Sequence, residues 1–436
     1  MIQTKVIKGA LSFGIGTGIS RILGLVREIV FAYLFGASWV MDAFRVAFRI
    51  PNLLRDLLAE GTLTPAFLPM FSDYYTREGR ESAIRFVSLV FGAMLMITGV
   101  ITVIGISFAP LWVKLISFGF TKYPDKFWLT VKLTRIMFPF LIFITISALV
   151  MGILNFFNHF FTTGIASGWF DIAVIALGLL FAAKLGVTSI AVGALIGGAL
   201  QLAYQLPLLK KENYLHIPKF GITQDVKKVL LLMVPISIGY GASKINVVVN
   251  TLIASFLEHG AISWLEYAFR LMFVPVGVIG VALSNALLPF ASRELSLDNR
   301  KEFKQTMSTS LLYGVAFAVP VSIVLGILAE PVCKIIYQRG NFLTSDTIAT
   351  AQALKFYCIG ITGLILARIL ATGFYALKET KTPMNVSFIT VVVNAVCALT
   401  LVRVFGFKGI ALAFSISNLV NAGILGILLK ERMRKI

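Results

Sequence analysis

The chain has 436 residues, of which 58% are hydrophobic and 14% charged, with a formal net charge of +19 and a mean hydropathy of +0.89. Soluble globular domains are about 45–50% apolar and about 25% charged, so this chain has too few polar residues to cover a water-soluble surface. These values exclude a cytosolic enzyme, a disordered chain and a secreted disulfide scaffold. We therefore expect an all-α polytopic membrane protein.

Apolar runs long enough to cross a bilayer follow one another along the chain. A transmembrane helix needs about 20 mainly apolar residues, and continuous rather than alternating runs indicate helices instead of barrel strands. Arg21 interrupts the first run and no small-residue cleavage site closes it, so we expect a retained helix and no signal peptide. Roughly twelve spans are predicted by this length criterion, near residues 9–35, 40–70, 84–109, 128–157, 165–184, 188–208, 226–257, 263–291, 306–329, 348–377, 383–403 and 408–429.

Lysine and arginine gather in alternate connections between the predicted spans. The connections on the side of Lys5 and Lys8, including the basic segment 209–228, hold most of them, and the other set holds few, among them Lys126. Because basic residues are retained on the cytoplasmic side, both termini are predicted to be cytoplasmic. The positive net charge is then explained by this topology. The sequence has no compact basic domain of the kind that would bind nucleic acid.

An internal repeat divides the predicted spans into two halves. The segment SWVMDAFR at 38–45 matches SWLEYAFR at 263–270 at five of eight positions, and Pro51 then matches Pro275. Six predicted spans separate the matched segments, so both halves share one orientation and a substrate site is expected at their interface. We predict two parallel-repeat six-helix lobes around a central cationic cavity, with boundaries at 1–208 for the N-terminal lobe, 209–225 for a cytoplasmic basic linker and 226–436 for the C-terminal lobe.

Ionisable residues crowd the first two predicted spans. Each Arg or Asp at the centre of a span costs about 2.5–3.5 kcal/mol on insertion scales, so these side chains must face a bundle interior or a water-filled cavity. Ion pairs between helices would explain the carboxylates, whereas the arginines outnumber the buried carboxylates we expect. Surplus guanidinium groups suit a phosphate, which arginine binds bidentately. The residues are Arg21, Arg27 and Glu28 in the first span, Asp42, Arg45, Arg49, Arg55, Asp56 and Glu60 in or beside the second, and Arg270, the counterpart of Arg45 in the second half.

Two further sets of residues have predicted roles in movement or coupling. Breaks within the second and eighth spans are typical of the mobile helices of transporters, and the residues are Pro51, Gly61, Pro275 and Gly277. Asn250 and Asn394 are the candidates for an ion site, with interhelical hydrogen bonding as their alternative role. The three cysteines and three histidines show no metal-ligand or disulfide spacing, so neither a metal nor another cofactor is predicted.

The charged segments carry the motifs SRILGLVRE at 20–28, PNLLR at 51–55 and AEG at 59–61, followed later by GFY at 373–375 and KTP at 381–383. Together these motifs resemble the MurJ/MviN family of lipid II flippases, within the multidrug/oligosaccharidyl-lipid/polysaccharide exporter superfamily, over nearly the whole chain. The resemblance implies a monomeric, non-enzymatic protein of the bacterial inner membrane that moves lipid II to the outer leaflet for cell-wall synthesis. It also implies substrate-facing arginines and required carboxylates, which are Arg21, Arg27, Arg55, Arg270, Asp42 and Glu60.

The chain departs from the family's pattern at two places. Family members usually have Arg-Asp where this chain has Arg27-Glu28, which keeps the charge and lengthens its reach by one methylene. Many members also carry two further C-terminal helices, thought to form a groove for the lipid tail, whereas this sequence ends after its twelfth predicted span. The path of the lipid tail is therefore left open.

Other functions satisfy parts of the pattern. A flippase for another polyprenyl-pyrophosphate glycan would use the same charges, whereas a cation-coupled drug exporter of the same superfamily should favour buried carboxylates and aromatic residues. A membrane enzyme would need a nucleophile–base pair, an acidic metal cluster or a phosphate-cradling glycine loop, and none is predicted. Coupling to a sodium ion and coupling to the membrane potential both remain open.

Overall fold

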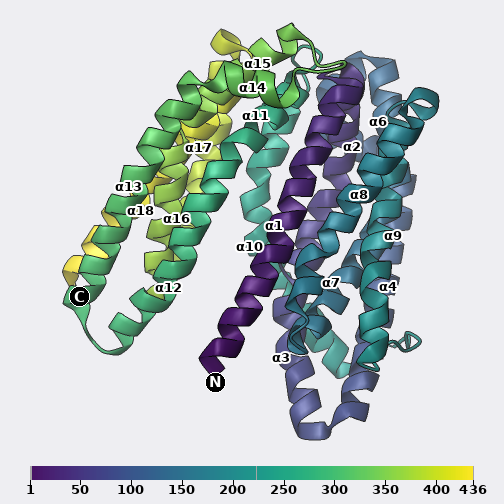
Figure 1. Cartoon of the computed structure of the whole chain (residues 1–436), viewed down its shortest axis with the longest axis vertical. Coiled ribbons are helices and arrows are strands. Elements are labelled where there is room, and N and C mark those ends of the chain that lie inside the picture. The colour runs from purple at the N-terminus through teal and green to yellow at the C-terminus, as the bar shows by residue number, and fades with distance from the viewer. Residues whose placement is uncertain (1, 222, 436) are drawn as a thin grey trace. The chain divides into compact units, whose positions relative to one another are not determined.

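The computed structural model of the chain describes the backbone of residues 2–221 and 223–435. Within these ranges the side chains of residues 2–8, 10, 60, 238–240, 242, 243 and 435 lie outside the description. Every regular element of the described residues is a helix, which confirms the predicted fold class (Figure 1). The chain divides into two compact units, Met1–Gly241 and Ala242–Ile436.

The first unit begins with a long helix and ends partway along another. Short π-helical turns (η1 and η2) and a 3₁₀ turn (η3) connect some of its α-helices. Its elements are α1 (Ile2–Phe35), α2 (Trp39–Arg55), η1 (Asp56–Glu60), α3 (Leu63–Asp73), η2 (Tyr74–Glu78), α4 (Arg80–Ser107), α5 (Ala109–Ile116), η3 (Phe118–Lys122), α6 (Pro124–Met137), α7 (Phe140–Phe156), α8 (Phe160–Leu185), α9 (Thr188–Lys211) and the first part of α10 (Gln224–Ala254).

The second unit contains the rest of α10 and a similar series of helices. One π-helical turn, η4, interrupts it. Its further elements are α11 (Ala261–Pro275), η4 (Val276–Gly280), α12 (Val281–Ser296), α13 (Arg300–Ile327), α14 (Ala329–Tyr337), α15 (Thr344–Cys358), α16 (Ile361–Ala376), α17 (Lys381–Phe405) and α18 (Phe407–Lys435).

The order of elements repeats between the two units, as the sequence repeat predicts. The series α2–η1–α3 and α11–η4–α12 both place a π-helical turn between two α-helices, and the long-short pair α4–α5 recurs as α13–α14. The caps recur as well, because α8 ends at Gly186 (φ 56°, ψ −142°) and α17 ends at Gly406 (φ 58°, ψ −141°). A positive φ favours glycine at both positions. The repeat therefore extends from single residues to whole elements.

The packing places the division between the units later than the predicted linker. Val226, Val229 and Met233 of α10 are buried in a core of the first unit together with Phe71 and Tyr214. The predicted linker itself lies on this unit, because the amide of Lys219 donates to the carbonyl oxygen of Ser88 at 3.0 Å. A basic, polar composition indicated exposure to water but did not indicate that the segment packs against its neighbours.

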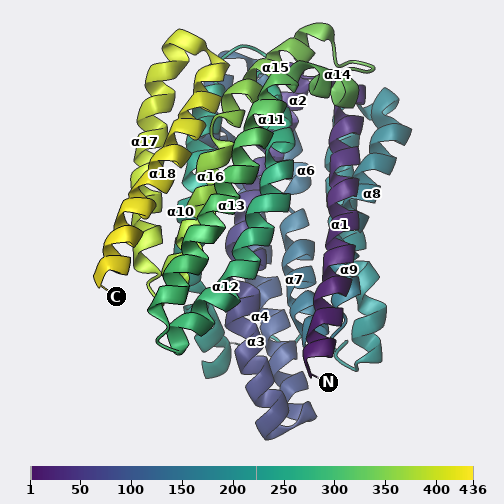
Figure 2. The same ribbon diagram turned by 60° about the vertical axis from the view of Figure 1, so that its left-hand side comes forward.

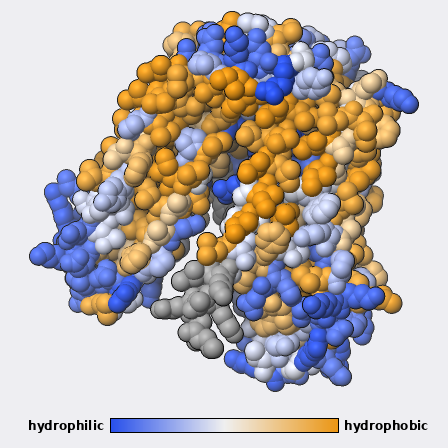
Figure 3. Space-filling view, in the orientation of Figure 1, coloured by the Kyte–Doolittle hydropathy of each residue, from blue (hydrophilic) through white to orange (hydrophobic). Residues whose placement is uncertain are grey.

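Each of the twelve predicted spans lies over helical residues, but their number as membrane spans is not confirmed. Eight helices within the described residues are long and apolar enough to cross a membrane, or nine if the bent pair α15 and α16, which meet at 42°, forms one span. Apolar residues cover the middle of each unit and polar residues gather toward its ends (Figure 3). This distribution is that of a multi-pass membrane protein.

Helix α1 packs along α8, and the two helices lie side by side in both ribbon views (Figures 1 and 2). Two glycines permit the contact. A Cβ atom on Gly16 would lie 2.8 Å from the carbonyl oxygen of Phe161, and one on Gly164 would lie 2.7 Å from that of Phe13. Small residues allow such close approach of helix backbones in membranes, so this contact fixes where the charged residues of α1 meet α8.

We expect Gly16→Ala to destabilise the protein by about 1–3 kcal/mol, the usual cost of forcing extra volume into a packed contact. Gly14→Ala is the matched control, because a Cβ atom there has no heavy atom within 4 Å and the gain in helix propensity is the same. Thermal unfolding of the detergent-solubilised protein measures both. Equal midpoints for the two variants would show that the α1–α8 contact is looser than described here.

Candidate functional site

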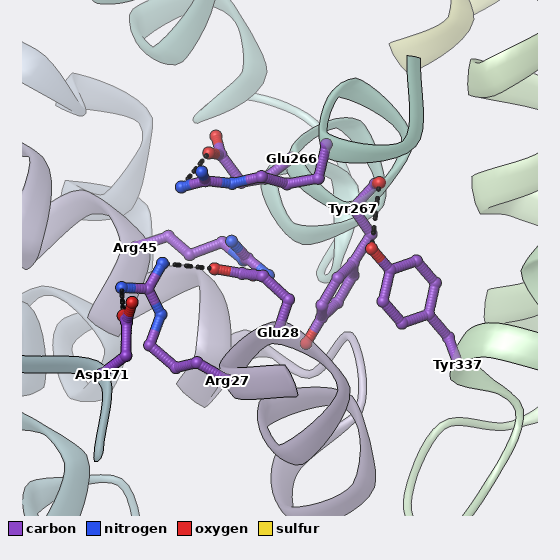
Figure 4. A network of polar contacts seen from close by, with 8 residues as sticks. Arg27, Glu28, Arg45, Asp171, Glu266, Tyr267 and Tyr337 are labelled. Carbon is purple, nitrogen blue, oxygen red and sulfur yellow. Dashed lines mark hydrogen bonds and ion pairs between the residues drawn. The ribbon is translucent and has the colours of Figure 1, made fainter. Parts of the chain in front are cut away.

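Four charged side chains from three helices meet inside the first unit (Figure 4). Arg27 of α1 contacts Asp171 of α8 through Nη1 at 2.7 Å and Glu28 through Nη2 at 3.0 Å. The second oxygen of Glu28 accepts from Nη2 of Arg45 on α2 at 3.1 Å. Glu28 therefore bridges the two arginines, and Arg27 links α1 to α8.

This cluster, which we call the arginine network, is nearly closed to its surroundings. The side chain of Arg27 is 12% exposed and that of Asp171 is 8% exposed, and the Arg27 guanidinium lies 5.7 Å from the ring centre of Phe31 and 5.8 Å from that of Phe170. Burying a charge requires partners, and here two positive and two negative formal charges cancel. Aromatic faces add cation–π attraction.

The structure corrects, for two of the arginines in the first two spans, the expectation that they lack carboxylate partners. Arg27 and Arg45 both have carboxylate partners, and one of these, Asp171, is absent from the residues proposed from the sequence. The sequence nevertheless marks Asp171 as unusual, because it is a lone acid within the apolar stretch 165–184. An acid inside a predicted span requires a partner, and this rule would have identified Asp171.

A second buried ion pair joins α2 to α6. Nζ of Lys126 lies 2.9 Å from Oδ2 of Asp42, and the two side chains are 4% and 1% exposed. The same ammonium lies 4.2 Å from the ring centre of Phe120. Placing Lys126 in a connection between spans was therefore wrong, because it lies in the first turn of α6, after Pro124, and points into the unit.

The second unit has a polar contact at the corresponding place in the repeat. Asp346 is the third residue of α15, as Lys126 is the third of α6. One of its oxygens accepts from the indole of Trp264 on α11 at 2.9 Å, and the other accepts from the backbone amide of Leu343 at 3.1 Å. In each unit an acidic side chain thus connects one helix, α2 or α11, to the start of a later helix, α6 or α15. The acid lies on α2 in the first unit and on α15 in the second.

The remaining predicted binding residues occupy more open positions. Arg21 is exposed on α1, and within the described residues it makes no hydrogen bond or ion pair. Arg55, at the end of α2, pairs with Asp56 at 3.0 Å and is 24% exposed. Arg270 on α11 lies 3.8 Å from Glu266 and is 47% exposed. The Glu60 side chain lies outside the described residues, so its predicted role cannot be placed.

The predicted hinge residues lie beside the π-helical turns. Helix α2 continues through Pro51 as far as Arg55, and the interruption comes at η1 and Gly61, which follows it. In the second unit α11 ends at Pro275, and Gly277 lies within η4. Kinks in helices commonly arise at prolines and π-bulges, and π-bulges are frequent at functional sites. A role in movement stays a prediction.

Asn250 and Asn394, the candidates for an ion site, contact one another in the second unit. Nδ2 of Asn394 on α17 donates to Oδ1 of Asn250 on α10 at 2.8 Å. This is the interhelical hydrogen bond proposed as their alternative role. Across the residues that the structure describes, no group of three or more His, Cys, Asp or Glu side chains could hold a metal ion, and an ion at the two asparagines stays a prediction.

Replacing Glu28 tests whether the bridge in the arginine network matters. Glu28→Gln removes the charge and leaves a single acceptor oxygen for two arginines. We therefore expect the lipid II transport that the family resemblance implies to fall at least about tenfold, given that a hydrogen bond to a charged group contributes about 1.5–3 kcal/mol. Glu28→Asp keeps the charge and both acceptors and should retain most activity. Transport rates of the two variants in vesicles decide this. If Asp were as damaging as Gln, the length of the side chain, not its charge, would be critical.

The repeated helical units, the membrane-crossing helices and the buried charges together define a multi-pass membrane transporter. Its fold matches an inward-facing multidrug resistance MATE family transporter of the MOP superfamily, with a TM-score of 0.79 at 14% identity over 95% of each chain. Another solved structure, titled lipid II flippase MurJ in an inward closed conformation, gives a TM-score of 0.84 at 29% identity over 96% of this chain and 87% of that one.

Sequence comparison identifies the family. Residues 31–436 match the family described as lipid II flippase MurJ. The chain is 34% identical over 420 residues to the probable lipid II flippase MurJ of Buchnera aphidicola subsp. Schizaphis graminum, covering 96% of this chain and 82% of that protein. It is also 34% identical over 425 residues to the lipid II flippase MurJ of Burkholderia cenocepacia, covering 95% and 82%. The chain belongs to the lipid II flippase MurJ family, as its motifs predict.

Proposed function

We propose that this protein is a lipid II flippase of the bacterial inner membrane, which moves the lipid-linked peptidoglycan precursor from the cytoplasmic to the outer leaflet by alternating access. The observation that carries the proposal is the family relationship, which spans nearly the whole chain. The MurJ structure with a TM-score of 0.84 supports it. The excess of Lys and Arg in alternate connections supports cytoplasmic termini.

Arginines in the membrane-spanning helices supply the chemistry that this function requires. Lipid II carries a pyrophosphate, and the planar guanidinium group binds phosphate oxygens through two parallel hydrogen bonds. We assign pyrophosphate contact to Arg27 in the first unit and Arg270 in the second, with Arg21 and Arg55 as further contacts. The carboxylates Glu28 and Asp42 are assigned to holding basic side chains in place, and Glu60 keeps the role of a required carboxylate that the family resemblance implies.

Growth rescue tests the proposed function. In a bacterium whose own lipid II flippase can be switched off, expression of this protein should restore growth and prevent the build-up of lipid II in the inner leaflet. A flippase for a different polyprenyl-pyrophosphate glycan would fail to rescue but would move that glycan in vesicles. A drug exporter of the same superfamily would do neither and would lower sensitivity to cationic drugs.

We assign the driving force to the membrane potential. The charges of the arginine network cancel without substrate, so the empty carrier returns with little net charge in this cluster, whereas the substrate brings about two negative charges. An inside-negative potential favours outward movement by about 2.3 kcal/mol per charge per 100 mV, or roughly 4–5 kcal/mol for two charges.

Imposing a potassium diffusion potential with valinomycin, with sodium absent on both sides, should therefore accelerate net outward flipping in one polarity only. A rate that ignores the sign of the potential would contradict this assignment. A rate that instead requires sodium and falls in an Asn394→Ala variant would assign coupling to an ion at Asn250 and Asn394.

A further inference from the structure

Three large apolar side chains are exposed within the basic linker that follows α9. Ile217 is 86% exposed, Phe220 is 65% exposed and Leu215 is 46% exposed. They lie in a stretch without regular secondary structure, residues 215–220, which we call the exposed linker segment. Single exposed apolar residues are common on protein surfaces, but three within so short a segment form a patch. Such patches mark contacts with a membrane or with a partner.

The exposed linker segment is held directly against α4. The amide of Lys219 donates to the carbonyl oxygen of Ser88 at 3.0 Å. A Cβ atom on Gly92 would overlap the carbonyl oxygen of Lys219, so the linker backbone lies on the surface of this helix. Just before the segment, the Arg80 guanidinium at the start of α4 lies 5.9 Å from the ring centre of Tyr214. These contacts fix the level of the segment along α4.

This level is the one at which a membrane begins on α4. The charged residues of the helix lie in its first turns, and none follows Arg85. Ser88 and Gly92 lie about 5 and 10 Å beyond Arg85, at about 1.5 Å per residue. Interfacial segments bury their apolar side chains about 5–10 Å into the boundary between headgroups and acyl chains. A water-soluble partner would meet the charged start of α4 first, so lipid is the occupant that this position favours.

The charge of the linker suits anionic headgroups. Lys210, Lys211 and Lys219 are exposed, and none of them pairs with a carboxylate within the part of the chain that the structure describes. The one acid between them in sequence is engaged elsewhere, because Oε1 of Glu212 lies 2.8 Å from Nε2 of His159. Basic residues at a membrane surface attract anionic lipids, and a lysine can keep its carbon chain among apolar groups while its ammonium reaches a phosphate.

We propose that the exposed linker segment is a binding site for anionic phospholipids of the leaflet on its side of the membrane, which is the cytoplasmic leaflet in the predicted topology. Leu215, Ile217 and Phe220 insert between the acyl chains, and the three lysines contact the lipid phosphates. The site is separate from the residues assigned to the transported substrate, so its test does not depend on the proposed function.

A fluorescent reporter measures the depth of the segment. Ile217→Cys carries bimane, a small uncharged fluorophore, on a Cys397→Ser background, and the two remaining cysteines are buried. The matched control is Leu297→Cys, because Leu297 is an apolar residue, 65% exposed, in the charged turn after α12.

In nanodiscs of phosphatidylcholine and phosphatidylglycerol, aqueous iodide should quench the label at position 217 at least severalfold less than the label at position 297. Phe220→Cys is a second reporter position if Ile217→Cys does not fold. Equal quenching by iodide at the linker and at position 297 would overturn the proposal and would indicate a surface for a water-soluble partner instead.

Paired lipid quenchers test the preference for anionic lipid. Phosphatidylglycerol and phosphatidylcholine carry the same doxyl group near the headgroup, each at the same small fraction in phosphatidylcholine nanodiscs. Phosphatidylglycerol should quench the label at position 217 severalfold more strongly, because each lysine at an anionic surface strengthens attraction by about fivefold.

Neutralising the lysines separates charge from apolar insertion. The triple variant Lys210→Gln, Lys211→Gln and Lys219→Gln should make the two lipid quenchers equal. Lys301→Gln with Lys304→Gln, on the exposed face of α13, is the matched control and should preserve the difference. Equal quenching by the two lipids with all lysines present, or a preference that survives the triple variant, would overturn the proposal.

Discussion

Replacing Arg27 with alanine should abolish growth rescue in protein that still reaches the membrane, even though the variant also removes one partner of the buried Asp171 and Glu28. The variant loses two charge-assisted contacts to the pyrophosphate, each worth about 1.5–3 kcal/mol, so flipping should fall about a hundredfold or more. Arg27→Lys should recover only part of the rate, because an ammonium cannot make the bidentate contact. Arg270→Ala should show the same loss in the second unit.

Two exposed arginines provide matched controls for these variants. Arg77 is 80% exposed and pairs with Asp73, and Arg300 is 50% exposed and pairs with Asp298. Alanine at either position should leave flipping near the wild-type rate. Full rescue by Arg27→Ala or Arg270→Ala, with membrane levels equal to the controls, would show that the pyrophosphate is held elsewhere.

Breaking the buried pair of Asp42 and Lys126 should have the largest effect on stability. Removing either partner leaves a buried charge without its counter-ion, which costs about 3–5 kcal/mol. Asp42→Ala and Lys126→Ala should each lower the unfolding midpoint sharply and lose rescue, because α6 loses its attachment to α2.

The double variant Asp42→Leu with Lys126→Met distinguishes a structural role from a direct one. Replacing a buried ion pair with apolar residues of similar volume is often neutral or stabilising, so the unfolding midpoint should recover. We expect flipping to recover as well, because the Asp42 carboxylate is only 1% exposed. Recovered stability without flipping would mean that the Asp42 carboxylate itself takes part in transport.

Much of the fold could be predicted because hydrophobic length and repetition are strong signals. The twelve predicted stretches all lie over helices, some of them broken by short turns. The match between 38–45 and 263–270 extends to the π-helical turns and glycine caps of both units. The division inside α10 could not be predicted, since the polar segment before it gives no sign that it packs against α4. The position of η1 could not be predicted either. The proline suggests a break at Pro51, whereas α2 continues through it to Arg55 and the π-helical turn follows.

The candidate site was predicted in part. Arg27 and Glu28 were identified because charges inside an apolar helix stand out, and the structure places them in contact with one another. Lys126 was placed in a connection because Pro124 and Asp125 before it resemble a turn. Asp171 was missed although an acid inside an apolar span requires a partner, and its local sequence does not show which basic residue that partner is. Which carboxylate meets which arginine depends on how α1, α2 and α8 pack, and local sequence does not specify this.

The most direct test of the proposed function is flipping of fluorescent lipid II in liposomes that contain this protein alone. A membrane-impermeant quencher reports how much lipid II reaches the other leaflet. We expect wild-type protein to move lipid II far faster than protein-free liposomes do, and Arg27→Ala protein to match the protein-free rate. Wild-type protein that moves lipid II no faster than empty liposomes, under either sign of the membrane potential and with or without sodium, would contradict the proposed function.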